Sequence, residues 1–215
     1  MTTLINDPRV LALPVRPVRE PLVRLADRGV RSATSGPGGL VRLGVADRLA
    51  RADRALPDGV HLLVVEGYRT FEAQCAIIDD YRATLTPLHP DATAGELDDL
   101  VSRFVAPAQA APHVAGAAVD CTLVDDDGAR LWMGTAIDDT PERSGGRCFT
   151  GSPDIDDEAR ANRAVLASVL EPVGMVNYET EWWHWSHGDR YWAYRTGAAA
   201  ARYEAVPAAA PGAVA

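Results

Sequence analysis

The sequence contains no lysine, only three cysteines and no long hydrophobic run. All 21 basic residues are arginine, which together with the abundant alanine we interpret as the coding bias of a GC-rich genome. The 30 acidic residues give a formal net charge of -9, which repels phosphate backbones and anionic lipid. No apolar stretch approaches the roughly 20 residues of a membrane span, and the N-terminus lacks the pattern of a signal peptide. We expect a cytoplasmic protein that binds neither nucleic acid nor membrane.

The chain has 215 residues, of which 47% are hydrophobic and 24% charged, as is typical of a globular protein with one substantial core. We predict a single domain over residues 1–204, beginning with an extended arm over 1–35, and a disordered tail over 205–215. The cysteines are odd in number and widely spaced, which argues against a disulfide framework and a thiolate zinc site, although one pair could form a bridge. They are Cys75, Cys121 and Cys148.

Apolar residues at helical spacing, together with capping signals, predict four helices. Thr70 is a suitable N-cap for the second of them, and acidic residues in the first turn of the fourth suit the helix dipole. The predicted helices span about 41–56, 71–85, 96–104 and 154–170.

Other segments favour strands. A short apolar run at 62–65 predicts a buried strand. Two hairpins are predicted, one joining 117–124 to 129–134 through "DDDG" and one joining 175–186 to 190–195 through "HGD". Helices combined with hairpins predict an α+β fold with a central antiparallel sheet flanked by helices.

A hydrolytic zinc site needs three nitrogen or oxygen ligands and a nearby carboxylate that is not a ligand. His61 and His89 have no acidic partner nearby in the sequence, so we assign them structural roles. In "HVAGAAVD", full extension would place His113 and Asp120 roughly 23 Å apart. A bend at Gly116 could bring them together. The alternative is a surface histidine followed by a hairpin aspartate.

The motif "EWWHWSHGD" places a carboxylate, Glu181, three residues before an imidazole, His184, within an aromatic environment. Glu181 is then a natural proton carrier beside a metal. The alternative is a half-buried strand of core tryptophans that includes an incidental glutamate. His187 is a rival ligand, although the glycine and aspartate after it favour a turn.

Together, "EGYR", "HVAGAAVD" and "EWWH" resemble the zinc DD-peptidase family (peptidase family M15), in its D-alanyl-D-alanine dipeptidase (VanX-type) branch. The likeness covers about residues 60–195, with the motifs in the family's order. It implies the zinc DD-peptidase (hedgehog-like) fold and one Zn²⁺ per chain. It also implies that Glu181 is the general base and later the acid. The implied zinc ligands are His113, Asp120 and His184.

The same resemblance implies that Arg69 stabilises the oxyanion formed during hydrolysis. The alternative for Arg69 is a salt bridge with an acid such as Glu66. The segment "MGTAID" is similar to the family segment whose aspartate binds the substrate's free amine. This makes Asp138 the candidate, with Asp139 as the competing choice.

The sequence departs from the family at Ala111, where a serine is usual, and in the N-terminal tyrosine segment, which is not evident here. The resemblance implies a dipeptidase that hydrolyses D-Ala-D-Ala or a related small dipeptide with metal-activated water. One alternative is a zinc amidase or peptidase for another small peptide, in cell-wall recycling or natural-product metabolism. Another is a non-catalytic zinc-binding module. The oligomeric state stays open.

Overall fold

The structure is a computed structural model that describes residues 2–102 and 105–206. Its α-helices are α1 (Pro8–Leu11), α2 (Leu43–Asp53), α3 (Phe71–Leu85), α4 (Ala94–Ser102), α5 (Pro141–Ser144), α6 (Asp157–Leu170) and α7 (Arg190–Thr196). Its strands are β1 (Leu22–Arg24), β2 (Arg31–Ser32), β3 (Leu40–Arg42), β4 (Val60–Glu66), β5 (Ala118–Asp125), β6 (Val176–Asn177) and β7 (His184–Ser186). Short 3-10 helices lie at Leu25–Arg28, Pro37–Gly39 and Thr86–Leu88.

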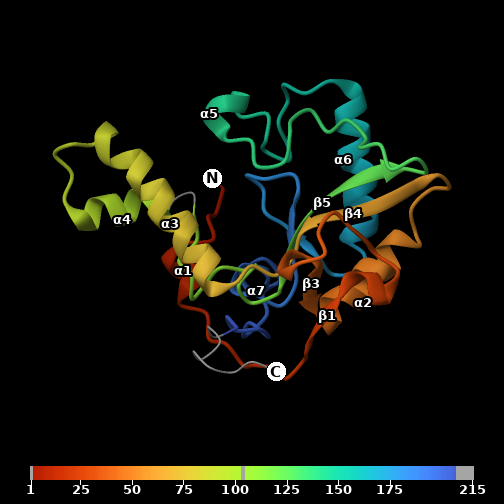
Figure 1. Cartoon of the computed structure of the whole chain (residues 1–215), viewed down its shortest axis with the longest axis horizontal. Helices are drawn as coiled ribbons and strands as arrows, with labels where there is room; N and C mark the ends of the chain where they lie inside the picture. The colour runs from red at the N-terminus through yellow and green to blue at the C-terminus, as the bar shows by residue number, and fades with distance from the viewer. Residues whose placement is uncertain (1, 103–104, 207–215) are drawn as a thin grey trace.

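The main sheet has five strands in the order β2-β4-β5-β7-β6, and β1 pairs with β3 in a second, two-stranded sheet. Every pair in the main sheet is antiparallel except β2 and β4, which run parallel. Helices α2 and α6 lie beside this sheet, while α3 and α4 form a hairpin that projects to one side of the molecule (Figure 1). The predicted α+β class is confirmed.

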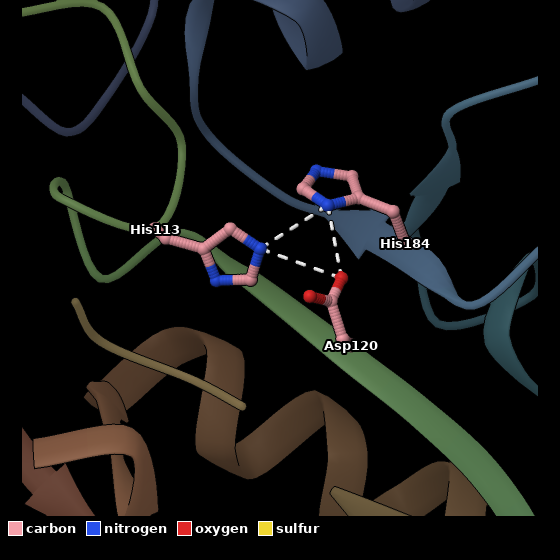
Figure 2. A group of neighbouring side chains, drawn as sticks. All are labelled: His113, Asp120 and His184. Atoms are coloured by element: carbon pink, nitrogen blue, oxygen red, sulfur yellow. Dashed lines mark hydrogen bonds and ion pairs between the residues drawn. The ribbon is translucent and has the colours of Figure 1, made fainter. Parts of the chain in front are cut away.

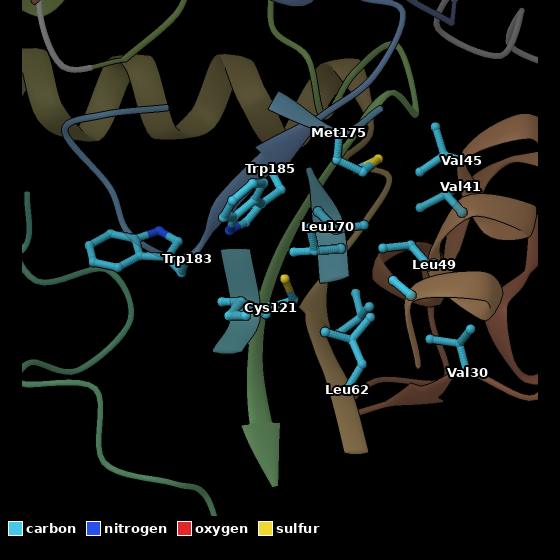
Figure 3. Close-up of a cluster of buried hydrophobic side chains, with 14 of the residues drawn as sticks. Val30, Val41, Val45, Leu49, Leu62, Cys121, Leu170, Met175, Trp183 and Trp185 are labelled. Atoms are coloured by element: carbon cyan, nitrogen blue, oxygen red, sulfur yellow. The ribbon is translucent and has the colours of Figure 1, made fainter. Parts of the chain in front are cut away.

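The hydrophobic core lies between one face of the sheet and the helices α2 and α6 (Figure 3). Side chains alternate along a strand, so Cys121 and Leu123 of β5 point into this core together with Leu62 of β4. The side chain of Asp120 therefore belongs to the opposite face. This alternation separates an apolar face, which holds the fold together, from a face that carries polar groups.

A bulge in β4 places another acid on the polar face. Val64 pairs with Cys121, but the register then shifts so that Glu66, instead of Val65, lies opposite Asp120. A bulge adds one residue to one strand and re-aims the side chains that follow it. The carboxylate of Glu66 is thereby brought beside Asp120.

For the second predicted hairpin, the strand expected after "HGD" is wrong. Residues 190–195 belong to α7, and Asp189 is the N-cap of that helix, accepting a hydrogen bond from the backbone N–H of Trp192 at 2.9 Å. Gly197, with φ 70°, ends the helix. The hairpin instead joins β6 to β7. In the first predicted hairpin the return segment makes only an isolated bridge, between Arg130 and Val124.

The predicted helices are present with shifted ends. Helix α2 begins at Leu43 and not at the predicted residue 41, because Val41 belongs to β3 and pairs with Val23 of β1. The side chain of Thr70 caps α3 as predicted, and Asp156 caps α6. Helix α4 runs to Ser102, and the last two residues of its predicted range lie outside the described residues.

The N-terminal arm contains short elements instead of a purely extended chain, including α1 and β1. It pairs with the C-terminal segment, where Arg16 N donates to Ala201 O at 2.9 Å. Of the predicted tail, residues 207–215 lie outside the described residues, whereas Val206 N donates to Val114 O. That residues 1–204 form one domain stays a prediction.

Across 2–102 and 105–206, no helix combines the length and apolar character that crossing a membrane requires.

Candidate metal centre and active site

Two imidazoles and one carboxylate meet on the polar face of the sheet (Figure 2). His113 Nε2 lies 3.2 Å from His184 Nδ1, and His184 Nδ1 lies 3.1 Å from Asp120 Oδ1. The third separation, between His113 Nε2 and Asp120 Oδ1, is 3.4 Å. All three residues are buried. The structure thus brings together the three side chains predicted as ligands.

Sheet pairing and a turn position these side chains. Asp120 of β5 lies directly opposite His184 of β7. His113 lies before β5 in a turn closed by a hydrogen bond from Gly116 N to His113 O, and Gly116 has a φ of 65°, which favours glycine. The Nδ1–H of His113 donates to the carbonyl of Gly67 at 2.7 Å. This fixes the tautomer and leaves Nε2 with a free lone pair.

The donor set fits a tetrahedral zinc ion. Bonds of about 2.0–2.1 Å at tetrahedral angles place neighbouring ligand atoms roughly 3.3 Å apart, and the three separations here lie between 3.1 and 3.4 Å. Burial works against a charge on Asp120, but the two imidazoles outweigh it and hold its pKa well below the usual range. The carboxylate is therefore ionised and ready to bind a cation.

Glu181 lies beside this group without belonging to it. Its Oε2 is 3.9 Å from His184 Nδ1, and it is not one of the three clustered donors. The side chain keeps 32% exposure, yet its carboxyl is largely surrounded by protein. Burial raises its pKa to about 7, with the charge of Asp120 adding to the effect and His184 opposing it. Such a carboxyl can exchange a proton near neutral pH.

Arg69 is held by two side chains. Its Nε donates to Glu66 Oε1 at 2.8 Å, its Nη2 contacts Glu66 Oε2, and its Nη1 donates to Gln74 Oε1 at 2.8 Å. The salt bridge considered as an alternative is therefore present. A guanidinium has five N–H donors, so two remain for another partner. Sequence reasoning did not find Gln74, and a single glutamine at the start of a helix gives no signal of this role.

Asp138 and Asp139 have different surroundings. Asp139 pairs with Arg143, with 3.3 Å between the carboxylate and Nε. Asp138 is exposed, has a positive φ of 63° and forms no ion pair within the described residues. Burial of its carboxyl group on one side, with the charges of Asp120 and Glu66, raises its pKa, while Arg69 opposes the shift. Asp138 therefore lies within electrostatic reach of the candidate metal centre.

The remaining histidines lie elsewhere. His187 donates from Nδ1 to the carbonyl of Gly174 at 2.9 Å and packs its ring on Trp192, and burial lowers its pKa to about 4. It is not part of the ligand cluster among the described residues. His61, which has no acidic partner nearby in the sequence, gains one in the fold, where its Nε2 lies 2.8 Å from Asp126 Oδ1. The chain folds so that residues distant in sequence become neighbours.

A cavity of about 840 Å³ lies apart from this site, lined in part by Trp185, Met175 and Glu171. None of the three clustered donors lines it. This cavity is therefore separate from the candidate metal centre.

Residues 39–203, well over half of the chain, match the family Peptidase_M15, D-ala-D-ala dipeptidase. The chain belongs to this family. The M15 relatives include a D-alanyl-D-alanine dipeptidase of Synechocystis sp., 28% identical over 86% of this chain and 89% of that protein. Another is a D-alanyl-D-alanine dipeptidase of Enterococcus faecium, 30% identical over 66% of this chain and 69% of that protein.

The structure of the LdcB LD-carboxypeptidase resembles this chain in fold, with a TM-score of 0.51 and 18% identity over 90% of this chain and 84% of that one. This likeness supports the predicted zinc DD-peptidase fold. Membership in the M15 family, together with the cluster of three candidate ligands, makes the chain a zinc metallopeptidase.

Proposed function

We propose that this M15 enzyme hydrolyses D-Ala-D-Ala or a closely related small dipeptide. The proposal depends on one observation above all: a cluster of His113, Asp120 and His184 beside a carboxylate, Glu181, that is not part of it. The relatives named D-alanyl-D-alanine dipeptidase support the choice of substrate.

In this proposal the three clustered side chains would hold one Zn²⁺, which would act as a Lewis acid and lower the pKa of a water molecule. Glu181 accepts the proton of the attacking water and later passes it to the leaving amine. Its Oε2 lies 3.9 Å from His184 Nδ1, beyond hydrogen-bond distance of that atom, so the carboxylate is available for this transfer.

Arg69 and Asp138 are proposed to contact the substrate. The two N–H donors of Arg69 that are free of Glu66 and Gln74 stabilise negative charge on the carbonyl oxygen. The Asp138 carboxylate binds the free amine of the dipeptide. This role suits Asp138 better than Asp139, because the latter already pairs with Arg143.

The residue at position 111 favours keeping a second class of substrate. Ala111 is buried and replaces the serine that is usual in the family, so a hydroxyl group is missing close to the ligand His113. A related peptide or amide is therefore the alternative substrate. A non-catalytic zinc module is disfavoured, because both Glu181 and Arg69 are kept in place.

The test is the release of free amino acid from D,D, L,D and L,L dipeptides by the zinc-loaded protein, with Glu181→Gln as the control variant. We expect turnover of D-Ala-D-Ala that the variant lacks although it retains zinc. Preference for another dipeptide would support the alternative substrate. A zinc-loaded protein that cleaves none of these dipeptides would contradict the proposal.

We also propose that the enzyme works in the cytoplasm, where it would reduce the supply of a cell-wall precursor or recycle wall fragments. Its three cysteines are all free thiols, as expected in a reducing compartment.

A further inference from the structure

The two candidate histidine ligands differ in how their second ring nitrogen is held. His113 Nδ1 donates to the carbonyl of Gly67. His184 faces the ligand cluster with Nδ1, and its Nε2 is buried with no hydrogen-bond partner among the described residues. A neutral imidazole that binds a metal through Nδ1 carries its proton on Nε2. His184 therefore needs an acceptor, and metal-binding histidines almost always have one.

Among the other buried polar atoms that lack a partner within the described part of the chain, three lie close by in sequence, on Ser186, His187 and Asp189. The His187 ring is held by Gly174 and Trp192, which leaves Ser186 and Asp189 as candidates. Ser186 follows His184 by two residues in β7, so both side chains lie on the same face of the sheet. Its Oγ has no partner. Asp189 uses Oδ1 to cap α7, while its Oδ2 is also unpartnered. These atoms comprise a donor, a hydroxyl that both accepts and donates, and an acceptor.

We propose that Ser186 and Asp189 form a hydrogen-bond relay that orients His184 as a metal ligand. In this relay His184 Nε2–H donates to Ser186 Oγ, and the Ser186 hydroxyl donates to Asp189 Oδ2. A serine side chain has a single heavy-atom torsion, so rotation about it re-aims the Ser186 hydroxyl without moving the strand. The relay deepens the proposed metal site and depends on His184 being a ligand.

The charges and hydrogen-bonding groups around Asp189 agree with this arrangement. Burial raises the pKa of Asp189, but the Ser186 hydroxyl and the imidazole of His184 both act in the opposite direction. An anionic acceptor at the end of the relay would make the imidazole a stronger donor to the metal.

Tyr178 offers the competing acceptor. Its ring stands against that of His184, with 5.9 Å between centroids and an interplanar angle of 72°. Its hydroxyl already accepts a hydrogen bond from the backbone N–H of Ile5. The relay is therefore preferred, and Tyr178→Phe distinguishes the two arrangements.

The experiment compares zinc affinity, by chelator competition, in the wild type, Ser186→Ala, Asp189→Asn and Tyr178→Phe. Asn at position 189 keeps an oxygen that can cap α7 but presents an amide instead of a carboxylate oxygen to Ser186. The matched control is Asp156→Asn, the same change at the N-cap of α6. The visible spectrum of the Co²⁺-substituted protein reports on the ligand geometry.

We expect Ser186→Ala and Asp189→Asn each to weaken zinc binding by about 10- to 100-fold and to alter the Co²⁺ spectrum. Because the relay acts as one unit, the double variant should bind zinc only slightly more weakly than the weaker-binding of the two single variants. The control Asp156→Asn and Tyr178→Phe should bind zinc as the wild type does. If Asp189→Asn fails to fold, Ser186→Ala alone decides the matter.

Wild-type zinc affinity in Ser186→Ala, or a loss confined to Tyr178→Phe, would overturn the relay while leaving the zinc site intact. An equal loss in Asp156→Asn would show that the effect belongs to helix capping, which also overturns it. If the wild-type protein fails to bind zinc, both the relay and the proposed function fail. The outcomes above overturn the relay alone, so the two failures are distinguishable.

Discussion

Replacing Glu181 by Gln should remove activity and stabilise the metal-free protein. Burial raises the pKa of Glu181 from 4.5 to about 7, so folding favours the protonated carboxyl. The stability contributed by this group is fully present below pH 4.5 and is lost as the pH rises through about 7. One pKa unit corresponds to about 1.4 kcal/mol, and the side chain is 32% exposed, so we expect a discounted loss of about 1–3 kcal/mol.

Glutamine is neutral at every pH and avoids this loss. In urea unfolding of the chelator-treated protein, Glu181→Gln should match the wild type near pH 4.5 and exceed it by about 1–3 kcal/mol at pH 8. Zinc should shrink the difference, because a nearby cation favours the carboxylate. With zinc bound, kcat should fall by about 10²- to 10⁴-fold.

The matched control for this prediction is Glu179→Gln, two residues away. Glu179 pairs with Arg195 on the surface, at 2.6 Å, so its substitution should change stability by at most about 1 kcal/mol and should not stabilise at high pH. If Glu181→Gln shows no stabilisation at pH 8, or if the control behaves in the same way, the assigned environment of Glu181 is wrong.

Three further predictions concern the surroundings of the site. Glu66→Gln should lower kcat roughly tenfold with zinc content unchanged, because Arg69 loses its bidentate partner; normal kcat would show that Glu66 does not position Arg69. Asp138→Asn should raise KM for a free dipeptide about tenfold or more, and Asp139→Asn should leave KM nearly unchanged; the reverse order would exchange their roles. Arg163→Met should lower the free energy of unfolding, measured in urea, by about 3 kcal/mol or more, because the buried guanidinium donates to the backbone carbonyls of Met133, Arg147 and Phe149. An unchanged midpoint would refute that structural role.

The three clustered residues could be predicted as candidate ligands because they are chemically distinctive and occur in motifs. Spacing alone did not decide whether the side chains of His113 and Asp120 meet, since seven residues can span about 23 Å or fold back. The resemblance selected the second possibility, and the structure shows how it is achieved. Asp120 is opposite His184 in the sheet, and a turn at Gly116 returns His113 to the same place.

Other features could not be predicted because they depend on tertiary contacts. The carbonyl of Gly67 that orients His113 is a backbone group, and no residue pattern announces it. The β-bulge that brings Glu66 opposite Asp120 is likewise hidden in an ordinary apolar run. The error at "HGD" has a different cause: Asp189 is favoured both in turns and at N-caps, and the aromatic residues after it suited a strand.

The central claim is that His113, Asp120 and His184 bind one zinc ion. Anomalous scattering at the zinc absorption edge, from a crystal of the zinc-loaded protein, tests it most directly. The account predicts a single strong peak about 2.0–2.2 Å from His113 Nε2, Asp120 Oδ1 and His184 Nδ1. An anomalous peak for zinc at another place, for instance at His187, with no peak at this cluster, would contradict it.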